Sequence, residues 1–521
     1  GELKSYKYSD KGSLGEDGNG KFDYATAIKY TDNASKHIFG LPVDVTVTGG
    51  DGSLYHHVTA KYNTNYANHI TQITQQLNDG EAVTDYKYDS YGNITQKTLP
   101  ANSKGQRMWY KYRYEPEMNM YVERIDDAWG YRSEQGNFDY RYGIAKEHRD
   151  LNNFYYETDV DDLGRITGVR GPNELATGVP YAIAFEYQPL ATFSESGITA
   201  PAYAVTKHYD IQHPNDDLET VTFVDGFGRA VQVKKDGVVT SASKGNSAKD
   251  ENVMIVSGRN VYDAFGRVAK AFYPTTEGTG SKSTFSKSFD NVSPTVTVYD
   301  VLDRATSVTL PDNSTTTTAY TVDNGSHALV TTVTDALHNV QATHTNGSGK
   351  TLKTIQKSGP DGEITTSFEY DGIQRLVRVT DTEGNVTTST YDMGDRRTEV
   401  NHPASGITSF TYDALGNVLT KQTANLAKEG KFITYDYDYQ RLTGINYPDH
   451  PENNVKYYYG GRNASQNRIG RLMLREDGTG AIEYFYGKMG EVTKTRRTMI
   501  VPNQAIATYV TQWTYDSHNR L

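Results

Sequence analysis

Short stretches of this chain alternate apolar and polar residues with a period of two. Clear cases are TVTVY (295–299), TTVT (331–334) and VRVT (377–380). Successive side chains of a β-strand point to opposite faces of a sheet, so this period indicates strands rather than helices. The pattern therefore predicts a protein built from many short β-strands.

One motif recurs between the alternating stretches: Tyr-Asp-x-x-Gly followed by Asn or Arg. It stands at 88–93, 262–267 and 412–417, and its Tyr recurs at 370, 391 and 412 with a spacing of 21 residues. Looser copies replace the Tyr or the Gly. The residues that we assign to repeat turns are Tyr88, Asp89, Gly92, Asp225, Gly228, Tyr262, Asp263, Gly266, Tyr299, Asp300, Tyr370, Asp371, Tyr391, Asp392, Tyr412, Asp413, Gly416, Tyr515 and Asp516.

The spacing inside the motif has a mechanical explanation. Asp favours the first position of a type I turn, where its carboxylate accepts bonds from backbone N–H groups. The residue three positions later takes the left-handed conformation that closes a hairpin with a bulge, and Gly does so without steric penalty. Asp303, Asp395 and Asn519 tolerate this conformation. Gln374 and His338 fit it less well, so we expect those two turns to differ.

A second turn signal stands near the middle of each block, as in Glu383-Gly384 and Ser405-Gly406. Each block is then two strands and two turns, which predicts a long antiparallel meander of hairpins. One hairpin cannot bury its own face, whereas stacked copies can. The chain has room for on the order of 40 strands, far above the ~10 at which open sheets curl or split. We predict an all-β fold that curls into a large wrapped surface.

The motif is unevenly distributed along the chain. It is degenerate in residues 1–257 and regular in residues 258–521, and no clean linker separates the two regions. We expect one continuous architecture. The polar stretches 241–252 and 274–288 are expected to be surface excursions.

Composition narrows the class of protein. Tyr occurs 41 times, the net charge is −11 and there is no Cys, while mean hydropathy is −0.68. The absence of Cys excludes disulfides, thiolate nucleophiles and Cys-ligated metals. The negative charge argues against a nucleic-acid binder. No membrane-spanning apolar run and no signal peptide are apparent. Because the chain begins without Met and ends inside a motif copy, we expect a fragment of a longer protein.

The repeated Tyr-Asp-x-x-Gly-Arg/Asn, followed by a strand and a second turn, resembles the RHS or YD-repeat family. VTFVDGFGRAVQVKKDG (221–237) and DVDDLGRITGVRGPNE (159–174) are similar to the B component of insecticidal Tc toxins. The resemblance implies a β-sheet cocoon around a C-terminal toxic or effector domain. Such proteins also carry an autoproteolytic C-terminal core, but no matching DPxGL-like stretch occurs here. Teneurins share the repeat, which makes adhesion the alternative.

Two glycine-rich stretches invite binding functions. HTNGSGKT (344–351) lacks the first Gly of a phosphate-binding loop, since His344 stands there, and we interpret it as a hairpin turn. GEDGNGKFD (15–23) resembles a calcium loop, but Lys21 and Ile28 occupy positions that need oxygen ligands. A glycine-rich surface turn is the better interpretation.

The acidic pairs Asp126-Asp127, Asp161-Asp162 and Asp216-Asp217 suggest glycosidase chemistry at first sight. Neighbours in a strand point to opposite faces, so these pairs do not make facing acids. The histidines lack the spacing of metal ligands. They are His56, His57, His208 and His213.

We therefore expect a non-catalytic shell that encapsulates a C-terminal toxin or effector domain of a secreted bacterial toxin. Its partners would be that domain and Tc-toxin-like or secretion-system components, with no cofactor, nucleic acid or membrane span. The alternative is a cell-surface adhesion or carbohydrate-binding module of the same fold. A glycosidase or other hydrolase comes third.

Overall fold

The computed structural model describes residues 2–9, 23–63, 68–194, 197–241, 248–287, 292–357, 362–516 and 520–521. It consists almost entirely of two antiparallel sheets, of 19 and 21 strands, with one separate two-stranded hairpin. The prediction of an all-β meander of hairpins is confirmed. The described helical elements are short: α1 (Pro172–Thr177), α2 (Ala424–Lys428), η1 (Ala34–Lys36), η2 (Thr279–Ser281) and η4 (Pro451–Asn453).

In the first sheet, each strand pairs with the strands before and after it in the chain, except that β14 pairs with β17 and β20 with β23. Its strands are β1 (Ser5–Tyr8), β2 (Tyr24–Asn33), β3 (Ile38–Gly49), β4 (Leu54–Tyr62), β5 (Ile70–Leu77), β6 (Gly80–Tyr88), β7 (Ile94–Ala101), β8 (Arg107–Tyr114), β9 (Val122–Asp127), β10 (Arg132–Asp139), β11 (Ile144–Arg149), β12 (Tyr155–Val160), β13 (Ile166–Arg170), β14 (Ile183–Gln188), β17 (Ala202–His208), β18 (Leu218–Val224), β19 (Ala230–Ser241), β20 (Lys249–Ser257) and β23 (Thr275–Gly278). β15 (Thr192–Ser194) and β16 (Gly197–Ala200) form the separate hairpin.

The second sheet begins just after β20 and continues the meander, with β22 pairing directly to β24. Its strands are β21 (Asn260–Tyr262), β22 (Val268–Ala271), β24 (Thr295–Tyr299), β25 (Ala305–Thr309), β26 (Thr315–Asp323), β27 (Ala328–Thr334), β28 (Val340–Thr345), β29 (Thr351–Lys357), β30 (Glu363–Tyr370), β31 (Leu376–Thr380), β32 (Val386–Tyr391), β33 (Arg397–His402), β34 (Gly406–Tyr412), β35 (Val418–Gln422), β36 (Ile433–Asp438), β37 (Arg441–Asn446), β38 (Val455–Tyr459), β39 (Leu472–Asp477), β40 (Gly480–Tyr486), β41 (Val492–Met499) and β42 (Ala507–Gln512).

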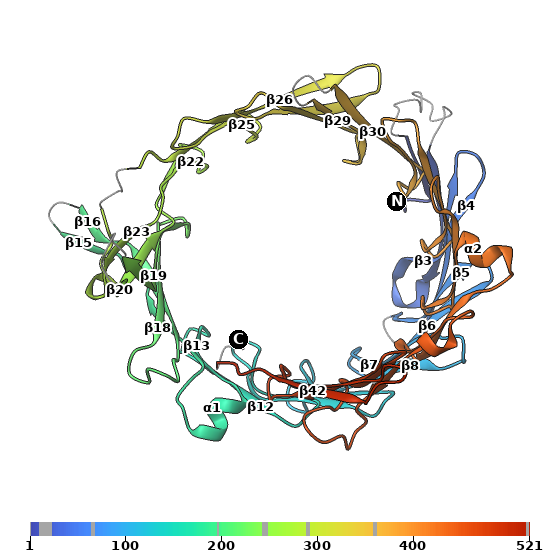
Figure 1. The fold of residues 1–521 in the computed structure, drawn as a ribbon, viewed down its shortest axis with the longest axis horizontal. Coiled ribbons are helices and arrows are strands. Elements are labelled where there is room, and N and C mark those ends of the chain that lie inside the picture. Colours follow the sequence, from blue (N-terminus) through green and yellow to red (C-terminus); the bar gives the residue numbers. More distant parts are fainter. Residues whose placement is uncertain are drawn as a thin grey trace.

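The strands form a ring around an open centre (Figure 1). The chain passes once around the ring and then continues alongside its own beginning, so that the blue first part and the orange and red last part share one side of the ring. Hydrogen bonds between the two turns join residues far apart in the sequence: Tyr55 and Gly372 are separated by 317 positions, and Asn152 and Ile469 also by 317. The fold is therefore a spiral, not a closed barrel.

The wall of the ring is thin. The accessible surface is 30408 Å², whereas a compact monomer of 58.0 kDa exposes about 19,000 Å². Among the described residues only twelve hydrophobic side chains are buried. A single sheet with both faces accessible accounts for both values.

The wall is thicker at one place, where residues 275–287 lie across β17–β20. Val221 and Phe223 are fully buried there, and Phe285 packs against the ring of Phe223. The side chain of Lys234 is also fully buried and binds Glu277 at 2.6 Å. Residues 274–287 lie at the surface, as expected, since none of them is buried. They also cover a small hydrophobic core, which the sequence did not predict.

Candidate functional site

The turn at 412–417 shows how each copy of the motif folds. The N–H of Asp413 donates to the carbonyl of Asn417, and the N–H of Gly416 donates back to the carbonyl of Asp413, both at 3.0 Å. One carboxylate oxygen of Asp413 accepts from the N–H of Asn417 at 2.8 Å, and the other accepts from its side-chain amide at 2.9 Å. Gly416 has a φ of +99°, and the sheet register shifts at Tyr412. The carboxylate thus holds the turn, and it also accepts a bond from the N–H of Ser103, in the other turn of the spiral, at 3.2 Å.

The Tyr of the motif links its hairpin to the preceding one. The hydroxyl of Tyr412 donates to the carbonyl of Arg397 at 2.8 Å, and that of Tyr391 to Leu376 at 2.9 Å. The same bond recurs in the other copies that begin with Tyr: Tyr88 to Ile70, Tyr262 to Ala230, Tyr299 to Val268, Tyr370 to Thr351 and Tyr515 to Val492. Tyr therefore carries a tertiary contact, not only a surface for packing.

The pair of backbone bonds that closes the turn recurs at other Asp residues of the motif, within the described ranges. The acids at its first position are Asp89, Asp161, Asp225, Asp263, Asp300, Asp335, Asp371 and Asp392. Gln374 has a φ of +69° and His338 of +64°, and both close the turn with the same two bonds as Gly. The expectation that these two turns differ is wrong, because the carboxylate and the bulge hold the left-handed residue whatever its side chain. Asn519 lies outside the described residues.

Where the motif ends in Arg, that Arg connects one turn to the next. The guanidinium of Arg375 binds Asp371 of its own turn at 2.6 Å, donates to the carbonyl of Asp392 in the next turn at 2.9 Å, and lies 5.1 Å from the ring of Tyr391. Arg396 repeats the arrangement toward Asp413 and Tyr412. Each turn thus helps to position its successor along one edge of the sheet, here called the YD edge.

The charges of this edge are stabilised by their neighbours. The hydrogen bond from Arg229, together with backbone N–H donors, lowers the pKa of Asp225. The corresponding bonds from Arg165 and Arg304 lower the pKa of Asp161 and Asp300. Burial opposes ionisation of Glu115, but bonds from backbone N–H groups outweigh it and lower its pKa to about 2. These carboxylates are anchored anions and not proton donors or acceptors near neutral pH.

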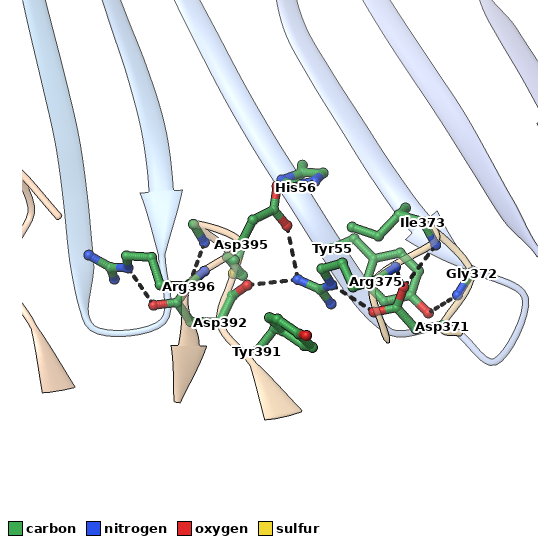
Figure 2. A network of polar contacts seen from close by, with 12 residues as sticks. Tyr55, His56, Asp371, Gly372, Ile373, Arg375, Tyr391, Asp392, Asp395 and Arg396 are labelled. Atoms are coloured by element: carbon green, nitrogen blue, oxygen red, sulfur yellow. Dashed lines mark hydrogen bonds and ion pairs between the residues drawn. The ribbon is translucent and has the colours of Figure 1, made fainter. Parts of the chain in front are cut away.

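The YD edge of the second turn of the spiral rests on the opposite edge of the first turn, here called the counter edge. Figure 2 shows this seam, where Asp371, Gly372 and Arg375 lie beside Tyr55 and Asp395 pairs with His56. The N–H of Gly372 donates to the hydroxyl of Tyr55 at 3.2 Å, and Arg375 lies 5.2 Å from its ring. A Cβ on Gly372 would approach the carbonyl oxygen of Asp23 to 2.2 Å. Only Gly allows this contact between the turns.

The seam continues through aromatic and amide side chains. The indole N–H of Trp129 donates to Asp438 at 2.8 Å, and Arg441 lies 3.6 Å from the Trp129 ring. Arg441 also donates to the hydroxyl of Tyr131 at 2.9 Å. Nearby, the amide of Asn102 donates to the carbonyl of Tyr439 at 3.1 Å. The two turns of the spiral are therefore joined by specific contacts over many hairpins.

The counter edge contains turns of the same kind that our sequence reading missed. Asn102, Asp127 and Asp150 each close a hairpin with the bonds seen at Asp413. They lack the preceding Tyr, so the motif search did not find them. The Asp/Asn-x-x-Gly/Asn spacing alone was the signal that could have revealed them. On the YD edge, the turn of Asn346 between β28 and β29 closes in the same way and donates to Gln374 of the turn at 371–375. HTNGSGKT is therefore the hairpin turn that we expected.

The acidic pairs have structural partners. Asp126 binds Arg124 and Arg132, at 2.6 and 2.8 Å. Asp217 accepts from the hydroxyl of Tyr181, a bond that raises the pKa of that hydroxyl to about 12. Asp162 follows the turn acid Asp161.

The described residues hold no group of three or more His, Asp or Glu side chains arranged to bind a metal. His213 pairs with Asp210, His56 with Asp395 and His57 with Asp44. Residues 15–22 of the calcium-loop candidate lie outside the described residues. No helix in the described ranges is long and apolar enough to cross a membrane.

Comparison with known proteins places the fold. The RHS-repeat family profile matches residues 370–407. None of the curated proteins matches the sequence. The crystal structure of TcdB2-TccC3 superposes with a TM-score of 0.73 at 14% identity, over 95% of this chain and 32% of that chain.

Two further structures give similar values. A Photorhabdus luminescens Tc holotoxin pore with a mutated TccC3 has a TM-score of 0.73 at 13% identity, over 95% of this chain and 33% of that chain. TcdB2-TccC3 without its hypervariable C-terminal region has a TM-score of 0.72 at 13% identity, over 95% of this chain and 33% of that chain. This chain spans about a third of the length of these proteins. The chain therefore contains an RHS repeat and has the fold of the TcdB2-TccC3 structures, as its resemblance to the RHS/YD-repeat family predicts.

Proposed function

We propose that this chain is a section of a non-catalytic RHS-repeat shell, which encapsulates and shields a C-terminal toxin or effector domain of a secreted bacterial toxin. The observation that carries the proposal is the thin wall around an open centre (Figure 1). A wall one sheet thick, whose surface far exceeds that of a compact protein of equal mass, suits enclosure. The similarity to TcdB2-TccC3 also holds for the structure that lacks the hypervariable C-terminal region.

The acids of the repeat turns hold structure, which supports the proposal that the shell is non-catalytic. The carboxylate of Asp413 accepts two bonds inside its own turn, and that of Asp371 accepts from its own backbone and from Arg375. Carboxylates whose oxygens are already bonded in this way are engaged in structural contacts and not offered to a substrate. We propose that the repeated Tyr and Asp residues form the wall and its seam.

The organisation and the partners complete the proposal. Residues 1–257 and 258–521 would be a degenerate and a regular region of one wall, which the change of sheet between β20 and β21 supports. The partners would be the chain's own effector domain and Tc-toxin-like or secretion-system components. The protein would act outside the bacterial cell.

Limited proteolysis of a longer natural chain, with its C-terminal domain, tests this function. We expect the C-terminal domain to survive in the intact protein and to be digested when the seam is opened by Trp129→Ala. The matched control is Val298→Ala, an exposed strand residue away from the seam. Digestion of the C-terminal domain at the same rate in the intact and denatured proteins would contradict the proposal.

The alternative is a cell-surface adhesion or carbohydrate-binding module, and one feature favours it. A groove of about 550 Å³ beside β40–β42 combines Phe485 and Trp513 with Asn467, Gln512 and Lys494. Aromatic rings with amide groups are suited to sugar rings. A glycan array probed with this chain distinguishes the two functions. A shell section should bind no specific glycan. A carbohydrate-binding module should bind a specific glycan, and Trp513→Ala should abolish that binding.

A further inference from the structure

The two turns of the spiral leave a small polar cavity between them. Its volume is about 200 Å³. The first turn lines the cavity with Arg132, Glu134 and Arg149, which belong to adjacent counter-edge hairpins, and the second turn lines it with Arg462 and Asn463. The cavity therefore lies inside the seam, between two parts of the wall that are both present, and not at an uncovered edge.

The wall that the second turn contributes is an enlarged copy of the repeat turn. The N–H of Gly460 donates to the carbonyl of Arg471 at 2.9 Å, and the N–H of Gly470 donates back to the carbonyl of Gly460 at 2.8 Å. The same two bonds close the regular repeat turn, which has only two residues between its ends, whereas this turn holds residues 461–469 there. The longer loop brings Arg462 to the cavity.

Contacts beside the cavity hold its walls in place. The hydroxyl of Tyr131, a residue only 5% exposed, donates to the carbonyl of Gly460 at 2.7 Å. The N–H of Ile469 donates to the side-chain oxygen of Asn152 at 3.0 Å, and the amide of Asn152 donates to the carbonyl of Ile469 at 3.3 Å. The two walls are therefore fixed relative to each other, so a ligand meets a preformed site and costs little ordering.

Positive charge exceeds negative charge around this cavity, although the whole chain has a net charge of −11. Arg149 donates to Glu134 at 2.9 Å, and Arg132 shares Asp126 with a second arginine. Arg462 forms no hydrogen bond or ion pair with the residues that the structure describes. Three guanidinium groups thus line the cavity with a single carboxylate. An anion would balance this excess of positive charge.

We propose that this cavity binds a free tetrahedral oxyanion, sulfate or phosphate, which links the two turns of the spiral. Guanidinium groups suit this ligand because their planar N–H donors pair with two oxygens of one anion. The cavity is smaller than the ~300–1,000 Å³ of pockets that enclose drug-sized molecules, which favours a free ion over a larger ester. Arg132 from one turn and Arg462 from the other then hold the same ion. The inference does not depend on the proposed shell function.

Equilibrium dialysis with labelled inorganic phosphate, at constant ionic strength in chloride, tests the site directly. We expect saturable binding that sulfate competes with. Arg462→Gln keeps the side-chain stem that lies near Gly130 but removes the charge, and it should weaken binding about tenfold. The matched control Arg378→Gln removes a guanidinium from β31, outside the cavity, and should bind phosphate as the natural chain does. Far-UV circular dichroism checks that both variants fold. No saturable binding up to about 20 mM phosphate, or equal weakening in both variants, would overturn the proposal.

Two further measurements test the link between the turns and the form of the ligand. Saturating phosphate should raise the melting temperature of the natural chain and of Arg378→Gln more than that of Arg462→Gln, because binding to the folded state stabilises it. A general salt effect raises all three melting temperatures equally, and that result would contradict the link. O-phosphoserine should displace phosphate only weakly. Displacement by this ester at a lower concentration than by sulfate would show that the site takes the phosphate group of a larger molecule, and it would overturn the assignment of a free ion.

Discussion

Two stretches of one edge use the same motif in different surroundings. The turns at 371–375 and 392–396 lie in the seam, where Arg375 stacks on Tyr55 of the other spiral turn. The turns at 225–229 and 263–267 keep the same internal bonds, and among the described residues no second turn of the spiral lies against them. The bonds of the motif are thus independent of docking. The docked and free stretches differ at the tip of the turn, two positions after Asp, and at the left-handed position. The left-handed residue is Gln374 or Asp395 in the docked turns and Gly228 or Gly266 in the free turns, and Asp395 contacts His56 across the seam. The motif therefore builds the edge, and these two positions adapt it to its neighbour.

The largest expected difference between the two stretches lies in an aromatic anchor. Trp129→Ala removes the ring under Arg441 and the bond to Asp438 at the seam, and we expect it to lower the free energy of unfolding by about 3 kcal/mol. Phe265→Ala, at an exposed tip, should change it little. Urea unfolding measures the free energy of unfolding of both variants, followed by far-UV circular dichroism because this signal does not depend on the deleted Trp. Equal losses of unfolding free energy in the two variants would contradict a stabilising role of the seam.

Removal of the turn acid should have the next largest effect. Asp392 is 5% exposed and holds Arg396 and two backbone N–H groups. Asp392→Ala leaves these donors unpaired, at a cost of about 2 kcal/mol. The matched variant on the free edge, Asp263→Ala, should cost less because Arg267 keeps Asp303 as a partner. The same unfolding assay compares them, and a larger loss in Asp263→Ala would argue against docking.

Substitutions of the left-handed residue should change the stability less, and in opposite directions at two turns. Gly416 has a φ of +99°, and a Cβ added to it would meet no atom within 4 Å, so Gly416→Ala should destabilise by about 1 kcal/mol through backbone strain alone. His338→Gly should relieve strain at a φ of +64° and stabilise slightly. Melting temperatures measure both. A stabilising Gly416→Ala would show that the turn does not need this conformation.

Acid should weaken the edge. Hydrogen bonds from the following Arg lower the pKa of Asp161, Asp225 and Asp300. Their folded pKa lies below the unfolded value of about 3.9, so their contribution is fully present above that value and is lost as the pH falls through the folded pKa. Melting curves from neutral pH to pH 2 should show no loss above about pH 5 and a progressive loss below it. Asp300→Asn, which keeps an amide for the turn, should give a shallower decline, and a steeper one would contradict the assignment.

Local structure was predictable from the sequence because the turn is made by neighbours. Asp413, Gly416 and Asn417 satisfy each other within six residues, so their pattern is enough to predict the hairpin. The seam is different, since Tyr55 meets Gly372 only because the curvature of the whole meander brings them together after 317 positions. The cover over Phe223 could not be predicted either, since residues 275–287 are polar apart from Phe285 and show no alternating strand pattern. Turns without Tyr, such as that of Asp150, needed the structure to be recognised.

Small-angle X-ray scattering of the monomeric fraction tests the central claim, that the chain is a thin spiral wall around an open centre. A compact protein of 521 residues would have a radius of gyration of about 24 Å. A thin wall around an open centre should give a clearly larger radius of gyration, a bell-shaped Kratky plot and a pair-distance distribution weighted toward long distances. A radius near that of a compact globule would contradict it.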